Sequence, residues 1–262
     1  MKISTIKIKT FLKKEGFYNT LSFILLVLVW KIISLLVGSE IIFPSPEDTF
    51  VSVFKLFKSS EFFLVILSSI KRGFFGFLIS LVLGIIFGFL AGFNKTFRKI
   101  FEPFMIVIRT IPIIALILIA LIWFKADNVP IFASFLIAFP IIYVNTVEGI
   151  RNTDIKLIQM SKIYNIRKLR VITEIYLPSL FPFLISAVST AVGTGWKVVI
   201  AAEVLSQPKY AIGTSLQTSK IYLNINDVFA WIIIAIFIGY IFERVIRLIG
   251  NRLVKWNKDY VS

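Results

Sequence analysis

Long apolar stretches alternate with short polar segments along most of the chain. About six of them approach the roughly 20 apolar residues that a helix needs to cross the hydrocarbon core of a bilayer. They cover residues 18–37, 73–93, 101–124, 131–150, 179–205 and 228–250. The stretches lack the polar alternation of a barrel, and in lipid only a helix pairs all the backbone groups of one segment. The pattern therefore predicts an all-α integral membrane protein, with a single transmembrane domain over residues 1–262 that contains a bundle of about six spans.

Basic residues are distributed unevenly among the segments between the spans. Lysines and arginines gather in residues 1–17, 95–99, 151–170 and 244–258, whereas the alternate connections hold few. Lys71 and Arg72 lie at the margin of the second span. The excess of Lys and Arg in the first group of segments persists if both residues are counted with the connections that hold few. Because cytoplasmic loops are the ones enriched in Lys and Arg, we expect a multi-pass protein of the bacterial cell (cytoplasmic) membrane. Its N- and C-terminal tails, 1–17 and 251–262, are both expected in the cytoplasm.

The composition excludes several classes of enzyme. Hydrophobic residues make up 58% of the chain, and Cys and His are absent. No cysteine nucleophile, disulfide, thiolate or imidazole metal site, or histidine acid–base pair is therefore possible. We expect no catalytic residue, no metal site and no cofactor on this chain. The net charge of +15 is explained by membrane topology, so we expect anionic membrane lipid and no nucleic acid as a partner.

A helix start is encoded directly after the first span, in "PSPEDTFVSVFKLF". Ser45 is a preferred N-cap residue, and Pro46 suits the first helical position. Glu47 and Asp48 favour the positive end of a helix, with Asp48 spaced for a capping box. We expect an external helix lying along the membrane interface.

Glycine recurs every four residues in the second span, at Gly84, Gly88 and Gly92. This spacing places the three glycines on one face, where a neighbouring helix can approach closely. Ordinary bundle packing accounts for the pattern.

The longest inner connection, 151–177, contains a helix–turn–helix pattern. Asn152, Thr153 or Asp154 can cap a helix, and Asn165 stands where a left-handed C-terminal residue is expected. The intervening helix would carry Leu157, Met160 and Tyr164 on one face, with Ile155 and Ile158 beside them. Leu177 and Pro178 would then open the fifth span. On these residues alone the element is an interfacial helix held by lipid, a docking element for a cytoplasmic protein, or a lid over a pore.

The same connection resembles the signature loop of the permease subunits of binding-protein-dependent ABC importers. That loop reads Glu-Ala-Ala, three residues, Gly, about nine residues, Ile, one residue, Leu-Pro. Counted back from Leu177 and Pro178, Ile175 matches, Asn165 replaces the Gly, and Gln159, Met160 and Ser161 replace Glu-Ala-Ala. Three further segments, "IRTIPIIALILIALIWF", "FPIIYVNTVEGIR" and "GWKVVIAAEVL", are similar to the nitrate, sulfonate and taurine branch of that family.

The resemblance implies a type I ABC importer permease fold with a cytoplasmic coupling helix that fits a groove on an ATPase. It also implies a second permease copy, expected as a homodimer, two separate ATP-binding subunits that bind ATP and Mg, and an extracellular or periplasmic solute-binding protein. The ATPase-coupling residues would be Asp154, Ile155, Leu157, Ile158, Gln159, Met160, Ser161, Tyr164, Asn165, Leu177 and Pro178. Consistent with a non-hydrolytic subunit, the chain lacks the Gly-x-x-x-x-Gly-Lys-Ser/Thr run of an ATP-binding loop.

Four residues within the spans are candidates for the translocation path. They are Arg109, Trp196, Lys197 and Glu203. Lys197, together with Arg109, would make the path electropositive for an anion. Arg109 would otherwise snorkel or bind carbonyls freed by Pro112, and Lys197 would otherwise pair with Glu203 of the second copy.

The pattern and the resemblance together predict the permease subunit of an ABC importer for a small anionic solute. Nitrate-, sulfonate- or taurine-like anions and vitamin precursors all remain open. A channel or secondary carrier that works without ATPases is the alternative, although the spans hold no convincing central Asp or Glu for a coupling ion. A membrane-embedded enzyme is disfavoured by the absence of His, Cys and paired carboxylates in the spans.

Overall fold

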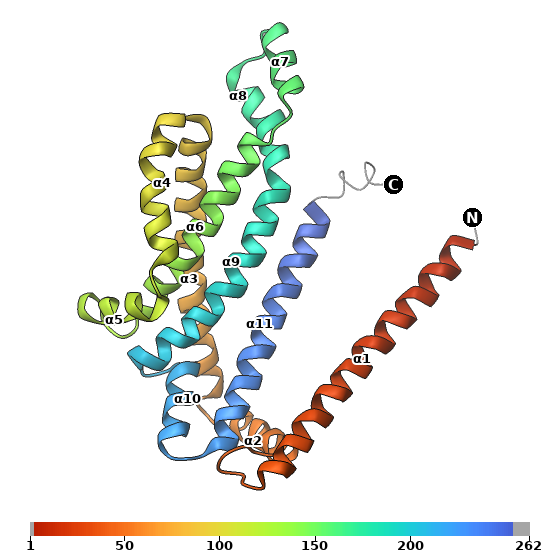
Figure 1. Cartoon of the computed structure of the whole chain (residues 1–262), viewed down its shortest axis with the longest axis vertical. Coiled ribbons are helices and arrows are strands. Elements are labelled where there is room, and N and C mark those ends of the chain that lie inside the picture. Colours follow the sequence, from red (N-terminus) through yellow and green to blue (C-terminus); the bar gives the residue numbers. More distant parts are fainter. Residues whose placement is uncertain (1–2, 254–262) are drawn as a thin grey trace. The chain divides into compact units, whose positions relative to one another are not determined.

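A computed structural model describes the backbone of residues 3–253 and the side chains of residue 18 and residues 20–250 (Figure 1). Every regular element in residues 3–253 is a helix, which confirms the all-α prediction. The predicted C-terminal tail, 251–262, lies almost entirely outside the described residues. The chain comprises two compact units, residues 1–60 with 216–233 and residues 61–215 with 234–262, and each is described by itself.

The first unit contains α1 (Ile3–Val37) and α2 (Pro46–Phe57), followed much later by the end of α10 (Ile212–Ile221) and the start of α11 (Ile225–Leu253). Trp30 of α1 donates its indole N–H to the carbonyl oxygen of Pro44 at 3.0 Å. Phe229 of α11 stacks on the Trp30 ring at a centroid distance of 5.9 Å. Aromatic packing and one hydrogen bond thus fix the connection between α1 and α2.

The start of α2 is built as predicted from its sequence. The Ser45 side chain accepts from the backbone N–H of Asp48 and also bonds the Asp48 carboxylate, and Pro46 occupies the first turn. Glu47 accepts from the ammonium of Lys31 on α1 at 2.9 Å. That hydrogen bond lowers the pKa of the Glu47 carboxyl below its ordinary value.

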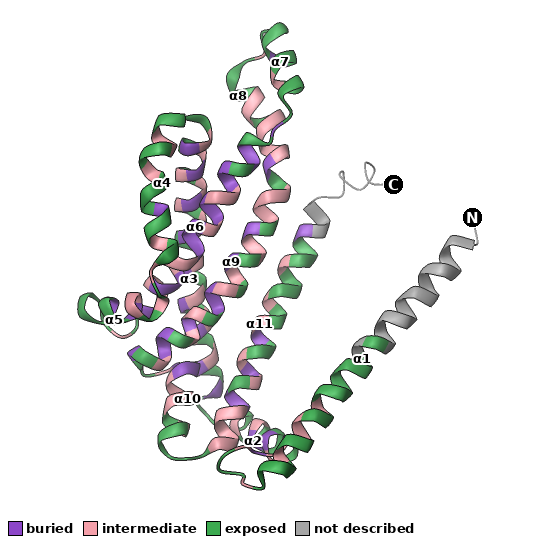
Figure 2. Cartoon of the chain, viewed as in Figure 1, coloured by how far each residue is buried: buried purple, intermediate pink, exposed green. Residues whose placement is uncertain are grey.

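The second unit is centred on one helix. Its elements are α3 (Phe62–Phe93), α4 (Lys95–Thr110), α5 (Ile113–Trp123), α6 (Val129–Arg151), α7 (Ile155–Ile163), α8 (Lys168–Val171), the π-helix η1 (Ile172–Tyr176) and α9 (Leu177–Ser206), with the start of α10 and the rest of α11. Figure 2 shows buried positions concentrated along α6. Ala138 and Ile142 of α6 form one buried cluster with Ala187 and Ala191 of α9. More than half of α6 is therefore covered by neighbouring helices.

The glycine ladder of α3 is the surface on which α6 packs, as predicted. A Cβ atom added at Gly84 would lie 2.8 Å from the side chain of Ile142. One at Gly88 would lie 2.5 Å from Thr146, and one at Gly92 would lie 2.7 Å from Ile150. Each distance is shorter than real Cβ contacts allow, so the missing side chains set the approach of the two helices.

The predicted third span, 101–124, is not one straight helix. α4 and α5 meet at an angle of 98° across Ile111 and Pro112. Ile111 is extended, at ψ 129°, because a residue before proline disfavours the helical region, and proline offers no N–H to continue a helix. Five described helices are long and apolar enough to span a membrane, or six if this bent pair counts as one span, which agrees with the predicted number.

Candidate functional site

The short helix predicted within the connection 151–177 exists as α7, and both of its ends are capped. The Asp154 side chain accepts from the backbone N–H of Lys156 at 2.8 Å, so Asp154 is the N-cap. Asn165 has φ of 50°, the left-handed conformation predicted for it. Its N–H donates to the carbonyl of Lys162, and the next N–H, of Ile166, donates to Ser161 at 2.9 Å. These two bonds form a Schellman motif, which ends the helix sharply and without a glycine.

Large apolar side chains on α7 are exposed. Ile155 is 66% exposed and Tyr164, at the C-cap, is 73% exposed, while Leu157 and Met160 are each more than two-fifths exposed. Gln159 is exposed and Ile158 is half-buried, whereas Ser161 is buried and donates its hydroxyl to the carbonyl of Ile158. Apolar side chains displayed together in this way are typical of a surface that another protein covers.

α7 is connected to a continuous helical run that becomes the fifth span. The run extends from Lys168 to Ser206 through α8, η1 and α9, so the span begins before Leu177 and Pro178 rather than at them (Figure 1). Pro178 has no N–H, and the turn just before it is a π-helix in which Leu177 donates to the carbonyl of Ile172. A π-turn lets the helix pass a proline without breaking. α8 and the fifth span therefore form one continuous helical run.

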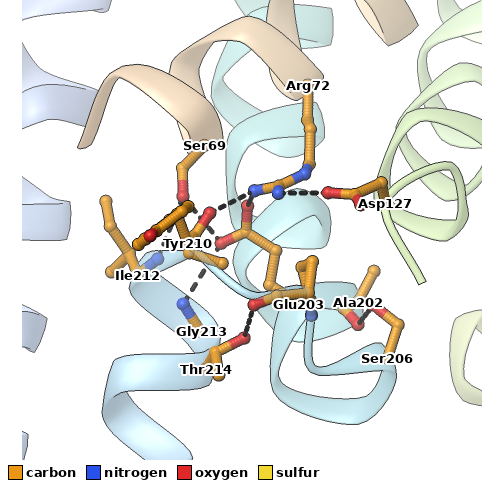
Figure 3. Close-up of polar contacts among 12 residues, drawn as sticks. Ser69, Arg72, Asp127, Ala202, Glu203, Ser206, Tyr210, Ile212, Gly213 and Thr214 are labelled. Atoms are coloured by element: carbon orange, nitrogen blue, oxygen red, sulfur yellow. Dashed lines mark hydrogen bonds and ion pairs between the residues drawn. The ribbon is translucent and has the colours of Figure 1, made fainter. Parts of the chain in front are cut away.

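A second candidate site is polar and has a buried carboxylate at its centre (Figure 3). The Glu203 side chain of α9 has no exposed surface. Its Oε1 accepts from Arg72 Nη1 of α3 at 3.0 Å. Its Oε2 accepts from Ser69 Oγ at 2.9 Å and from the backbone N–H of Gly213 at 3.1 Å. Both oxygens are thus satisfied by donors of the same chain.

Arg72 extends this network to other segments. Nη1 also donates to the carbonyl of Tyr210 at 2.8 Å, and Nη2 donates to Asp127 Oδ1 at 2.5 Å. The Arg72 side chain is 9% exposed, whereas that of Asp127 is 70% exposed. Ser69 Oγ accepts from the N–H of Ile212 at 3.0 Å. One guanidinium and one carboxylate therefore tie α3, α9, the connection before α6 and the start of α10 together.

The close fit around Glu203 depends on Gly213. A Cβ atom at this position would lie 2.5 Å from Glu203 Cβ and 2.5 Å from the backbone oxygen of Ile200. Only glycine lets the first turn of α10 approach closely enough for its N–H to reach the carboxylate.

These contacts correct the prediction for Glu203. The carboxylate pairs with Arg72 and not with Lys197, and a side chain without exposed surface does not line a path. Lys197 is exposed on α9, and its role stays a prediction. Trp196 is nearly buried, donates to the carbonyl of Ala235 at 2.9 Å, and packs against α11.

Arg109, the remaining candidate, lies close to the end of α4 and lines a polar cavity between α4 and α6. Its membership of the path stays a prediction.

The role of Arg72 differs from that of the marginal charge predicted from the sequence. Arg72 lies ten residues into the 32-residue helix α3. An arginine inside a long apolar helix is costly unless paired, which is the signal that could have identified it.

Comparison with known proteins identifies the family. Residues 80–255 match the model of the family described as binding-protein-dependent transport system inner membrane component. The chain belongs to this family. The permease is 29% identical to the aliphatic sulfonates transport permease protein SsuC of Bacillus subtilis, over 90% of this chain and 86% of that protein. It is 31% identical to SsuC of Escherichia coli over 90% of both chains.

A more distant relative is the taurine transport system permease protein TauC of Escherichia coli, 21% identical over 90% of this permease and 88% of TauC. Among solved structures, a chain of the inward-facing MetNI methionine ABC transporter superposes with a TM-score of 0.55. The two are 17% identical, and the match covers 73% of this permease and 91% of that chain. The permease therefore has the fold of an ABC importer permease.

Proposed function

We propose that this permease forms the translocation path of an ABC importer for a small sulfonate- or taurine-type anion. Membership of the binding-protein-dependent family supports the class of transporter. The solute class rests on the relatives, which are named for aliphatic sulfonates and taurine. The single structural observation that carries the mechanism is a capped helix, α7, joined to a span that is helical from Lys168 to Ser206.

The mechanism follows from the exposed face of α7. Ile155, Leu157, Met160 and Tyr164 would fit an apolar groove of a partner ATPase, one ATPase below each of two permease copies. Asp154 and Asn165 hold the helix at fixed ends, so a push on α7 moves it as a rigid piece. Gln159, Leu177 and Pro178 keep the spacing of the signature loop. ATP and Mg would be bound by the ATPases, and a solute-binding protein would deliver the anion on the opposite face of the membrane.

The termini would then be cytoplasmic, on the side of α7. Displacement of α7 by ATP binding would pass through α8 and η1 into α9, and would open the path alternately to each side. The buried Arg72–Glu203 pair would hold α3 and α9 together at the other end, so the two helices would move as one body.

The test uses the double variant Leu157→Asp/Met160→Asp, with the exposed-site variant Thr96→Asp as its control. Each transporter is purified with its ATPase and reconstituted in vesicles, and uptake of radiolabelled taurine is measured with the binding protein and ATP. Two buried carboxylates in an apolar groove would be desolvated without partners, so docking and uptake should be lost. The Thr96→Asp control should retain uptake.

Unchanged uptake by the double variant would refute the coupling role of α7. Uptake by the wild-type permease without ATP or an ATPase would instead favour the channel or secondary carrier.

A further inference from the structure

A polar cavity of about 270 Å³ lies between α4 and α6 in the second unit. Its polar lining consists of Arg98, Glu102, Arg109, Tyr143, Glu148 and Arg151. On α4, Arg98, Glu102 and Arg109 recur along one face, and α6 contributes Tyr143, Glu148 and Arg151. The cavity is thus lined by polar side chains from both helices.

Positive charge is in excess in this cavity. Three guanidinium groups face two carboxylates, and among the described side chains none of these arginines is ion-paired. Elsewhere among the described residues, Arg72, Arg170 and Arg247 pair with carboxylates, whereas Arg167 and Arg244 do not. The guanidinium groups of the cavity are therefore available to an anion.

Tyr143 provides a second and independent observation. This residue is 4% exposed, and its hydroxyl has no hydrogen-bond partner among the described residues. Its ring is held by Phe101 and Phe139, at centroid distances of 5.5 and 6.3 Å. Burying a hydroxyl without a partner costs stability, so such a group in a polar cavity indicates a missing acceptor.

We propose that this cavity binds a small oxoanion, such as a sulfonate or phosphate group. Guanidinium groups match the geometry of such an anion with paired N–H donors, and the phenol adds an O–H donor. The cavity volume suits a small molecule, and Met105, Val144 and Val147 line it beside the polar groups. The proposal rests on the proposed function, because it makes the cavity a subsite for the transported anion within one copy of the permease.

Binding is measured by titrating ethanesulfonate, and separately inorganic phosphate, into the full-length permease with its ATPase in phosphatidylcholine nanodiscs. The variants are Arg109→Gln and Tyr143→Phe. The control is Lys99→Gln, which removes a positive charge from the same helix outside the cavity lining. Saturable binding to the wild type is expected, with the dissociation constant raised about tenfold or more by Arg109→Gln and several-fold by Tyr143→Phe. The control should stay within about twofold of the wild type.

A stability readout separates binding from folding. Without ligand, Tyr143→Phe should melt at the same temperature as the wild type or higher, because it removes an unpartnered hydroxyl. With ligand, the melting temperature of the wild type should rise more than that of the variant. Absence of saturable binding, or binding that both variants leave unchanged, would overturn the proposal and leave water as the occupant of the cavity.

A second lipid composition identifies the source of the anion. Equal ethanesulfonate binding in nanodiscs with and without phosphatidylglycerol supports a soluble anion. Competition by phosphatidylglycerol that depends on Arg109 supports the same oxoanion site occupied by a lipid phosphate. Failure of the site and failure of the proposed function are distinguishable, since ATP-driven uptake by the wild type and anion binding in this cavity are measured in separate assays.

Discussion

Removal of Arg72 isolates the contribution of the buried ion pair. In Arg72→Met, Glu203 Oε1 loses its donor, while Oε2 keeps Ser69 and Gly213. Breaking a buried pair by deleting one partner costs about 3–5 kcal/mol, because the remaining charge stays buried. We expect the lower end, about 3 kcal/mol, since two of the donors to the carboxylate survive.

The assay is reversible unfolding in mixed dodecylmaltoside and dodecylsulfate micelles, followed by tryptophan fluorescence. The matched control is Arg170→Met, the same substitution at the exposed pair with Glu174, which should cost no more than about 0.5 kcal/mol. The double variant Arg72→Met/Glu203→Gln should cost less than the sum of its single variants by about 1–3 kcal/mol, because the residues are in contact.

The reasoning would be refuted if Arg72→Met destabilised the permease no more than Arg170→Met does. Additive costs in the double variant would likewise show that Arg72 and Glu203 do not stabilise each other.

Two further substitutions test the packing and the cap. Gly88→Ala should lower the free energy of unfolding by about 1–3 kcal/mol, because its Cβ would overlap Thr146. The control Gly193→Ala, with open space around its Cβ, should leave the free energy of unfolding unchanged or raise it by up to about 1 kcal/mol. Equal effects of the two variants would contradict the close approach of α3 and α6. Asn165→Val should speed hydrogen exchange in α7, because a β-branched residue in the left-handed region costs at least about 1–2 kcal/mol. The control Asn165→Gly should leave the exchange rate unchanged. Unchanged exchange in the valine variant would contradict the cap.

The features predicted correctly are those that a short sequence window determines. The Ser45 cap of α2, the left-handed Asn165 and a cap of α7 within residues 152–154, which the structure places at Asp154, each depend on a few neighbouring residues. The glycine ladder could also be predicted from the sequence, because a helix places every fourth residue on one face. Its packing partner α6 could not be predicted, since periodicity on one helix does not identify the helix that covers it.

Features that depend on distant contacts or on competing local preferences were missed. Arg72 and Glu203 are 131 positions apart, and from the sequence Arg72 lies at the margin of its span while Glu203 is a candidate for the translocation path. The third span looked continuous because its apolar run is unbroken, although Pro112 stops the helix. Hydropathy indicates whether a segment lies in lipid or in water, but it does not indicate a bend within that segment.

The measurement that tests the central claim most directly is purification of the tagged permease from its native membrane in mild detergent, followed by peptide mass identification of the subunits that remain bound. The account predicts that a cytoplasmic chain with an ATP-binding loop copurifies in a stoichiometric amount. This chain should no longer copurify when Leu157 and Met160 of α7 are replaced by Asp. Recovery of the folded and transport-competent permease alone would contradict it.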